Sequence, residues 1–231
     1  MTRPAGPAWA PGSFLSRITV PERDALLALG VTRRLPAGRR ILVEGGRDTH
    51  VEVLREGHVK ITTEVGGVPR LLAIRLPGDI VGEFAAITGN GRSATVTTCG
   101  EVVSTVIRQA EFLRFLGEHP HVANQVTATV GQRLRWANER RSEFAAYPVH
   151  VRLAHVLGEI AASCGEAVRD GVLIGVELSQ TELATLVGAA EDTVQKALRL
   201  LRDQGLVRTG YRRITVVDHA ALRAVAEGAD P

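Results

Sequence analysis

The sequence predicts an α+β fold in which a small β-barrel or jelly roll comes first, one long helix follows, and a mostly helical region ends the chain. Short apolar runs, separated by glycine and proline, fill residues 33–108. Residues 122–144 contain one glycine, Gly131, and no proline, which is typical of a single long helix. Pro148 then opens a region with apolar residues at helical spacing. These three observations define the expected order of elements.

Length and composition limit the class of protein. The chain has 231 residues, of which 45% are hydrophobic and 23% charged, as in folded globular proteins of one or two domains. Its apolar runs are far shorter than the ~20 residues that cross a bilayer, and its first residues lack the apolar core of a secretory signal. We therefore expect a cytoplasmic protein with no membrane partner.

Composition shifts along the chain predict four segments. Residues 1–13, rich in proline and glycine, are expected to form a disordered tail. Residues 14–121 are assigned to the barrel, and residues 122–147 to the long helix and a hinge. Residues 148–231 are assigned to the C-terminal domain, in which a Thr209-Gly210 turn is expected to join two short strands as a hairpin.

The long helix carries an imperfect heptad seam, which indicates a homodimer. One heptad position holds Ala123, Val130, Ala137 and Phe144, and the other holds Thr127, Leu134 and Arg141. Most remaining positions are charged, which favours burial of the seam against a second copy of the helix; they include Arg133, Arg135, Glu139, Arg140 and Glu143. Packing of the helix on its own barrel is the alternative.

Residues 178–201 have the pattern of a helix-turn-helix. Gln180 begins the first helix, Ala184 is small where two helices cross, and Gly188 stands at the turn. Apolar residues of the second helix then face inward, which leaves polar ones facing outward. The DNA-binding candidates are Ser179, Gln180, Asp192, Thr193, Gln195, Lys196, Arg199 and Arg212.

Charge is concentrated where this motif predicts DNA contact. The whole chain has a net charge of +3, and the region from Pro148 onward has nine basic and eleven acidic residues. Residues 193–217, in contrast, hold six basic residues and one acidic residue. Such a local excess is what contact with phosphates requires, and it favours DNA binding over an ordinary solvated helical pair.

A second constellation predicts an anion site. A Gly82-Glu83 pair is joined to an Arg92-Ser93 pair across a short segment. Backbone N–H groups near Gly82 and Ala85, the guanidinium of Arg92 and the hydroxyl of Ser93 can bind a phosphate, and Glu83 can accept from a ribose hydroxyl. A structural ion pair between Glu83 and Arg92 is the alternative.

The order of these parts, with the motifs REGHVKI, PGDIVGE, GRSATV and PVHVRLA, resembles the cyclic-AMP receptor protein family of transcription regulators, the Crp/Fnr superfamily. The resemblance spans roughly residues 35–218 and implies a cyclic-nucleotide-binding barrel, a dimerisation helix and a winged helix-turn-helix. It also implies a palindromic DNA operator, contact with RNA polymerase and a cyclic nucleotide, with cAMP favoured, as effector. The implied ligand residues are Gly82, Glu83, Phe84, Ala85, Arg92, Ser93 and Asn138.

Two departures from the family pattern bear on specificity. Ala137 and Asn138 stand where cyclic-AMP sensors have hydroxyl side chains that face the adenine, although the amide of Asn138 can still pair with a base edge. Ala190 and Glu191 replace a serine cap and an arginine at the start of the second helix, which predicts a different operator.

The sequence contains no pattern of a metal site, a tightly bound cofactor or an enzyme. We therefore predict a homodimeric regulator whose barrel binds a cyclic nucleotide and sets the arrangement of two recognition helices. Two alternatives remain. The same DNA-binding regulator can respond to another effector or to none, or the barrel can be a nucleotide-binding module that acts on a protein partner.

Overall fold

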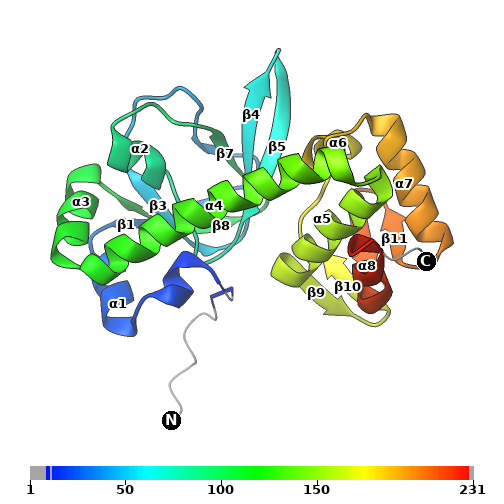
Figure 1. Ribbon diagram of the computed structural model, residues 1–231. Helices are drawn as coiled ribbons and strands as arrows, with labels where there is room; N and C mark the ends of the chain where they lie inside the picture. The colour runs from blue at the N-terminus through cyan, green and yellow to red at the C-terminus, as the bar shows by residue number, and fades with distance from the viewer. Residues whose placement is uncertain (1–8, 11, 229–231) are drawn as a thin grey trace, which may run out of the picture. The chain divides into compact units, whose positions relative to one another are not determined.

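The computed structural model describes residues 9–10 and 12–228 (Figure 1). The chain forms two compact units, one comprising Met1–Pro69 with Ala73–Leu134 and the other Arg70–Leu72 with Arg135–Pro231. Together they give the α+β class that the sequence predicts. Within the described part of the chain, no helix is both long and apolar enough to cross a membrane.

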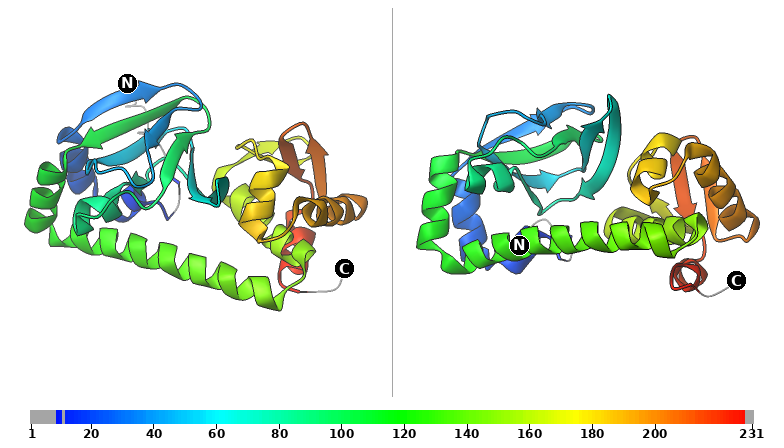
Figure 2. Two further views of the ribbon diagram at one scale, coloured as in Figure 1. Left: turned by 90° about the horizontal axis from the view of Figure 1, so that it is seen from above. Right: turned by 45° about the horizontal axis from the view of Figure 1, so that its top comes forward.

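Two four-stranded sheets form the barrel of the first unit (Figure 2). One sheet has the strand order β1-β8-β3-β6 and the other β2-β7-β4-β5. Strands far apart in sequence pair with each other, as where Val53 of β3 faces Thr105 of β8. The strands are β1 (Val31–Leu35), β2 (Arg40–Leu42), β3 (Val51–Glu56), β4 (Val59–Val65), β5 (Val68–Arg75), β6 (Ile80–Val81), β7 (Thr95–Thr98) and β8 (Val102–Ile107).

The described residues of this unit form two buried clusters. Leu42, Leu54, Val59 and Val96 belong to a cluster contributed by strands of both sheets, so they fill the barrel. A second cluster joins β3, β6 and β8 to the surrounding helices, with Phe14, Phe112 and Val122 buried. Burial of such side chains supplies the driving force for packing the helices on the sheet. The helices are η1 (Phe14–Arg17), α1 (Val20–Ala28), α2 (Glu83–Thr88) and α3 (Gln109–Glu118).

The predicted N-terminal tail lies partly outside the described residues, which omit 1–8 and 11. Its described part is packed on the barrel: Trp9 contacts the core cluster, and Ser13 is buried. The N–H of Ala10 donates to Pro77 O at 3.4 Å. Residues 9–10 and 12–13 thus contact the barrel, whereas the rest of the predicted tail lies outside the described residues.

Helix α4 (Pro120–Ala146) is continuous and confirms the predicted long helix (Figure 1). Its inner face has a side chain at every third or fourth position, buried or half-buried: Val122, Val126, Thr129, Arg133, Trp136 and Arg140. Arg133 and Arg140 lie on this face, and each has partners within the unit to which it belongs.

The predicted heptad seam is largely exposed in the single chain. Thr127, Leu134 and Ala137 face solvent, and Leu134 is 62% exposed. Phe144 is also exposed, at 41%, although part of its ring lies against the helix-turn-helix turn and the guanidinium of Arg152. The exposed part of the seam is available to a second chain.

The second unit is a winged helix-turn-helix. Helix α5 (Val149–Cys164) packs on α6 (Gln180–Val187), α7 (Glu191–Asp203) and α8 (His219–Ala226). A four-stranded antiparallel sheet has the order β11-β12-β10-β9. Its strands are β9 (Gly165–Val168), β10 (Gly171–Ile174), β11 (Val207–Gly210) and β12 (Arg213–Val216).

The wing hairpin of β11 and β12 is present, but its turn is not where the sequence places it. Thr209 and Gly210 lie within β11, and Gly210 pairs with Arg213. Tyr211 and Arg212 form the turn, and Arg212 has a φ of 53°. Glycine usually fills such left-handed positions, and Arg212 gives no such signal in the sequence.

Candidate effector site and nucleic-acid interface

Gly82 begins the cassette, which is the segment from Gly82 to Ser93 predicted to bind an anion. This glycine precedes α2 with a left-handed φ of 84°. A Cβ at this position would lie 2.6 Å from Nη1 of Arg92 and 2.9 Å from the His50 carbonyl. Only glycine meets both the conformational and the steric demand, so Gly82 allows Arg92 to approach the start of α2.

The structure brings Arg92 to that point and buries it. Its side chain is 2% exposed. Nη1 donates to Gly82 O at 3.0 Å, and Nη2 donates to His50 O at 2.7 Å and to Asp48 Oδ2 at 2.6 Å. Burial raises the pKa of the Asp48 carboxyl, but the hydrogen bonds and charge of Arg92 outweigh burial and leave that pKa below its usual value. Arg92 is thus held in place by the chain itself.

Glu83 pairs with Arg133 of α4 and not with Arg92, so the alternative of a Glu83–Arg92 ion pair is wrong. Arg133 Nη1 donates to Glu83 Oε1 at 2.6 Å, and its Nη2 donates to Ile80 O at 2.8 Å. Arg75 interacts electrostatically with both Glu83 and Arg133. Burial and the charge of Arg133 lower the pKa of the Arg75 guanidinium to about 10, while the charges of Asp79 and Glu83 oppose this shift. The Glu83 carboxylate therefore interacts with the positive charges of Arg133 and Arg75.

The other cassette residues differ in exposure. Ala85 is buried in α2, whereas Phe84 and Ser93 are exposed, Phe84 at 43%. Asn138 is exposed on α4 and belongs to the second unit, so its contact with a ligand base stays a prediction. Among the described residues, no group of three or more His, Cys, Asp or Glu side chains could hold a metal ion.

The helix-turn-helix forms as the sequence predicts. Ser179 caps α6: its hydroxyl accepts from Glu182 N, and its own N–H donates to Glu182 Oε2 at 2.8 Å. Gly188 ends α6 in the left-handed region with a φ of 63°, and a Cβ there would lie 2.8 Å from the Phe144 ring. Ala190 gives α7 no side-chain cap, as expected.

Two buried arginines hold the end of α6 in place. Arg140 donates to Leu186 O at 3.0 Å and to Glu159 Oε2 at 2.7 Å, and its guanidinium lies 4.1 Å from the Trp136 ring centroid. Arg152 donates to Val187 O at 2.6 Å. The last carbonyls of a helix lack intrahelical partners and carry partial negative charge, so cations are stabilised there.

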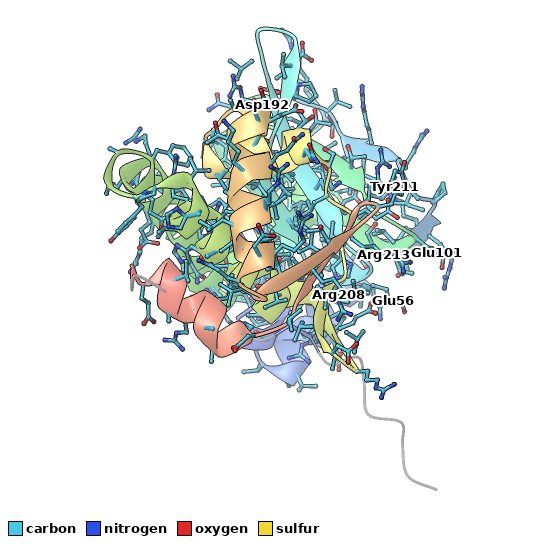
Figure 3. All side chains as sticks on the ribbon, turned by 90° about the vertical axis from the view of Figure 1, so that its right-hand side faces the viewer. Glu56, Glu101, Asp192, Arg208, Tyr211 and Arg213 are labelled. Carbon is cyan, nitrogen blue, oxygen red and sulfur yellow. The ribbon has the colours of Figure 1, made fainter. Side chains whose placement is uncertain are left out.

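The division of α7 into two faces is confirmed. Val194, Ala197 and Leu201 are buried, while the outward side chains are exposed. A groove of about 460 Å³ separates α7 from the wing. In Figure 3, Asp192 lies at the start of α7, and Tyr211 and Arg213 lie on the wing. The exposed DNA-binding candidates are Gln180, Asp192, Thr193, Gln195, Lys196, Arg199 and Arg212.

Several cations of this face lack a carboxylate partner. Among the described residues, Lys196, Arg199 and Arg213 form no ion pair, and all three are exposed. Arg208 and Arg212 make only long exposed contacts, of 3.5 Å to Asp170 and 3.7 Å to Glu177. Exposed pairs of this kind contribute little to stability, so these side chains can turn to phosphates.

Sequence reasoning missed five residues of these sites: Asp48 and Arg133 at the cassette, Arg140 and Arg152 at the helix-turn-helix, and Tyr211 at the wing tip, which is 89% exposed. A signal existed for Arg133 and Arg140, because both continue the 3- and 4-residue spacing of Val122 and Val126. The other three depend on contacts or turn geometry that local spacing does not encode.

The geometry defines a protein with a barrel that holds the Gly82–Ser93 cassette and a winged helix-turn-helix with an exposed basic face. Residues 32–119 match the cyclic nucleotide-binding domain model, and residues 151–225 match the Crp-like helix-turn-helix domain model. The chain belongs to the Crp/Fnr family of transcription regulators.

Similar proteins extend over most of the chain. The cyclic AMP receptor protein of Thermus thermophilus is 27% identical over 94% of this chain and 98% of its own length. A CRP-family transcriptional regulator from the same organism has a structure with TM-score 0.71 and 25% identity, covering 84% of this chain and 96% of that one. The c-di-GMP-responsive global regulator CLP of Xanthomonas campestris shares the fold, with TM-score 0.74 and 19% identity over 87% of this chain and 100% of that one.

Proposed function

We propose that this chain is a cytoplasmic, homodimeric regulator whose barrel binds a cyclic nucleotide, with cAMP favoured, and whose two recognition helices then bind a palindromic operator. The unpaired, exposed cations of α7 and the wing carry the DNA-binding part of the proposal. The cassette of Gly82, Glu83 and Arg92, with Ser93 exposed beside it, supports the nucleotide part. RNA polymerase is the expected protein partner.

In this proposal the ligand acts by exchange. A cyclic phosphate accepts from Arg92 and Ser93 in place of Asp48, and a ribose hydroxyl donates to Glu83 in competition with Arg133. Arg133 lies on α4, the helix that continues toward the DNA-binding unit. A ligand shifts an equilibrium only by its difference in affinity between two states, and a change in the Glu83–Arg133 pair supplies such a difference.

A second candidate is a regulator that binds DNA without a cyclic mononucleotide. The observation that favours it is the internal pairing of the cassette, because Arg92 and Glu83 are already satisfied by Asp48 and Arg133. The relatives are also divided: one is named a cyclic AMP receptor protein, another a c-di-GMP-responsive regulator.

Calorimetric titration of the purified protein with cAMP, and with cGMP as comparison, separates the two candidates. Micromolar binding of cAMP at one site per chain supports the first. No detectable binding of either nucleotide, together with equal retention of genomic DNA fragments with and without nucleotide, supports the second candidate. Failure to retain any DNA would favour a nucleotide-binding module that acts on a protein partner.

The dimer is tested on the exposed seam of α4. Leu134→Glu places a charge where we expect the two helices to meet, and sedimentation should then give the mass of one chain. Glu139→Ala, an exposed change away from the seam, should leave the dimer intact. A wild-type protein that sediments as a single chain contradicts this assignment.

A further inference from the structure

Two glutamines meet across the helix-turn-helix, although fifteen positions separate them in sequence. Gln180 is the first residue of α6, and Gln195 is the fifth residue of α7. The Nε2 group of Gln195 donates a hydrogen bond to Oε1 of Gln180. Both side chains are exposed, so the pair forms on the outer surface and is not part of the core.

The hydrogen bond fixes which groups of Gln195 remain free. A glutamine amide has two N–H donors and one carbonyl acceptor. Donation to Gln180 through the N–H that points away from Oε1 leaves the other N–H and Oε1 of Gln195 side by side. This is the pattern that pairs with the major-groove edge of adenine, whose N7 accepts and whose N6 amino group donates.

The surroundings separate base reading from phosphate contact. The groove beside α7 is lined by both glutamines and by Arg199, Arg202, Arg212 and Arg213. The cations supply the attraction to phosphate, which carries no sequence information. A neutral amide adds little to that attraction but gains a bidentate pair from one base only. The amide of Gln180 keeps two N–H donors for a nearby phosphate oxygen.

We infer that Gln195 reads an adenine in the major groove of each half-site, and that Gln180 positions the Gln195 amide for this pairing. The inference rests on the proposed DNA-binding function and specifies one base that the protein recognises. Gln195 contacts the base, whereas Gln180 acts through Gln195.

Selection of duplexes from a random library, with the full-length protein, tests the base contact. The wild-type protein should enrich sites with an adenine at one symmetric position. Gln195→Ala should lose the preference at that position alone, with affinity for the selected site reduced between about fivefold and a hundredfold. Gln195→Glu should shift the preference toward cytosine, because a carboxylate accepts from the cytosine N4 amino group. Gln204→Ala, at the far end of α7, is the matched control and should change nothing.

Positioning by Gln180 has its own readout. Gln180→Ala removes the acceptor for Gln195 Nε2 and should broaden the base preference at the same position. Gln180→Glu keeps an acceptor there and should retain the adenine preference, even though its charge weakens binding to all DNA. If Gln180→Ala loses affinity for all DNA equally and keeps its base preference, then Gln180 contacts a phosphate and does not position Gln195.

A modified base separates this inference from the proposed function. Replacing the selected adenine by 7-deazaadenine removes the N7 acceptor. The DNA affinity of the wild-type protein should therefore fall, while the DNA affinity of Gln195→Ala should not change. If the wild-type protein enriches a site and Gln195→Ala changes the base preference at none of its positions, the inference is wrong. The proposed function as a DNA-binding regulator is then unaffected. Wild-type protein that retains no DNA overturns both.

Discussion

The two functional regions use the same residue types in opposite ways. At the cassette, the Arg92 side chain is 2% exposed and Glu83 is buried, and each is satisfied by partners in its own chain. On α7 and the wing, Lys196, Arg199 and Arg213 are exposed and form no ion pair among the described residues. A ligand at the barrel must replace internal contacts, whereas DNA meets side chains that are already available.

This difference predicts different costs of mutation. A buried charged group that loses its partner is strongly destabilising, whereas an exposed one is almost neutral to the fold. Variants at the cassette should therefore affect both folding and binding, and variants on the DNA face should affect binding alone.

The largest effect is expected for Arg92→Ala. The change removes the predicted phosphate contact and leaves the carbonyls of Gly82 and His50 without their donor, so nucleotide binding should be lost and unfolding should become easier by ~2–3 kcal/mol. Calorimetry and chemical denaturation measure the two effects. Arg47→Ala, an exposed change in the β2–β3 loop that carries Asp48, is the control and should affect neither. Unchanged nucleotide affinity in Arg92→Ala would show that the cassette does not bind the nucleotide.

Arg140→Ala tests whether a buried pair also matters in the second unit. It leaves Leu186 O without its donor and Glu159 without its partner, so the unit should be destabilised by ~2 kcal/mol. Thermal melting followed by circular dichroism measures this. Arg135→Ala, an exposed change on α4 outside the predicted seam, should melt like the wild type. Equal melting of the two variants would show that Arg140 does not stabilise the helix-turn-helix.

Lys196→Ala should weaken specific operator binding by ~1–3 kcal/mol and leave the melting temperature unchanged, because Lys196 is exposed and has no ion-pair partner in the described chain. Fluorescence anisotropy on the selected operator and on random DNA measures the specificity. An equal loss on both DNAs would assign Lys196 to a phosphate and not to a base.

The smallest effect is expected for Arg212→Gly at the wing tip. Glycine relieves the left-handed strain at φ 53° and should raise the free energy of unfolding by up to ~1 kcal/mol. The same change removes a positive charge, so DNA affinity should fall and its dependence on salt should become shallower. Arg212→Asn, which tolerates the same backbone and also lacks the charge, should reproduce the loss of affinity. Unaltered salt dependence in both variants would exclude Arg212 from DNA contact.

Local patterns were sufficient for the elements and insufficient for the partners. Gly188 and the apolar spacing from Leu183 to Leu201 predicted the helix-turn-helix, because a left-handed turn and a close helix crossing demand particular residues at fixed offsets. The wing turn was misplaced, because the left-handed position is taken by Arg212 and not by Gly210.

The sequence by itself determined the order of barrel, long helix and winged helix-turn-helix, and the residue types of both sites, because periodicity, turn residues and charge distribution are local properties. Only the tertiary structure decided that Arg133, and not Arg92, pairs with Glu83, and that Gln195 meets Gln180. These contacts join residues 50 and 15 positions apart, and the choice among several arginines or amides depends on which side chains folding brings within hydrogen-bond distance.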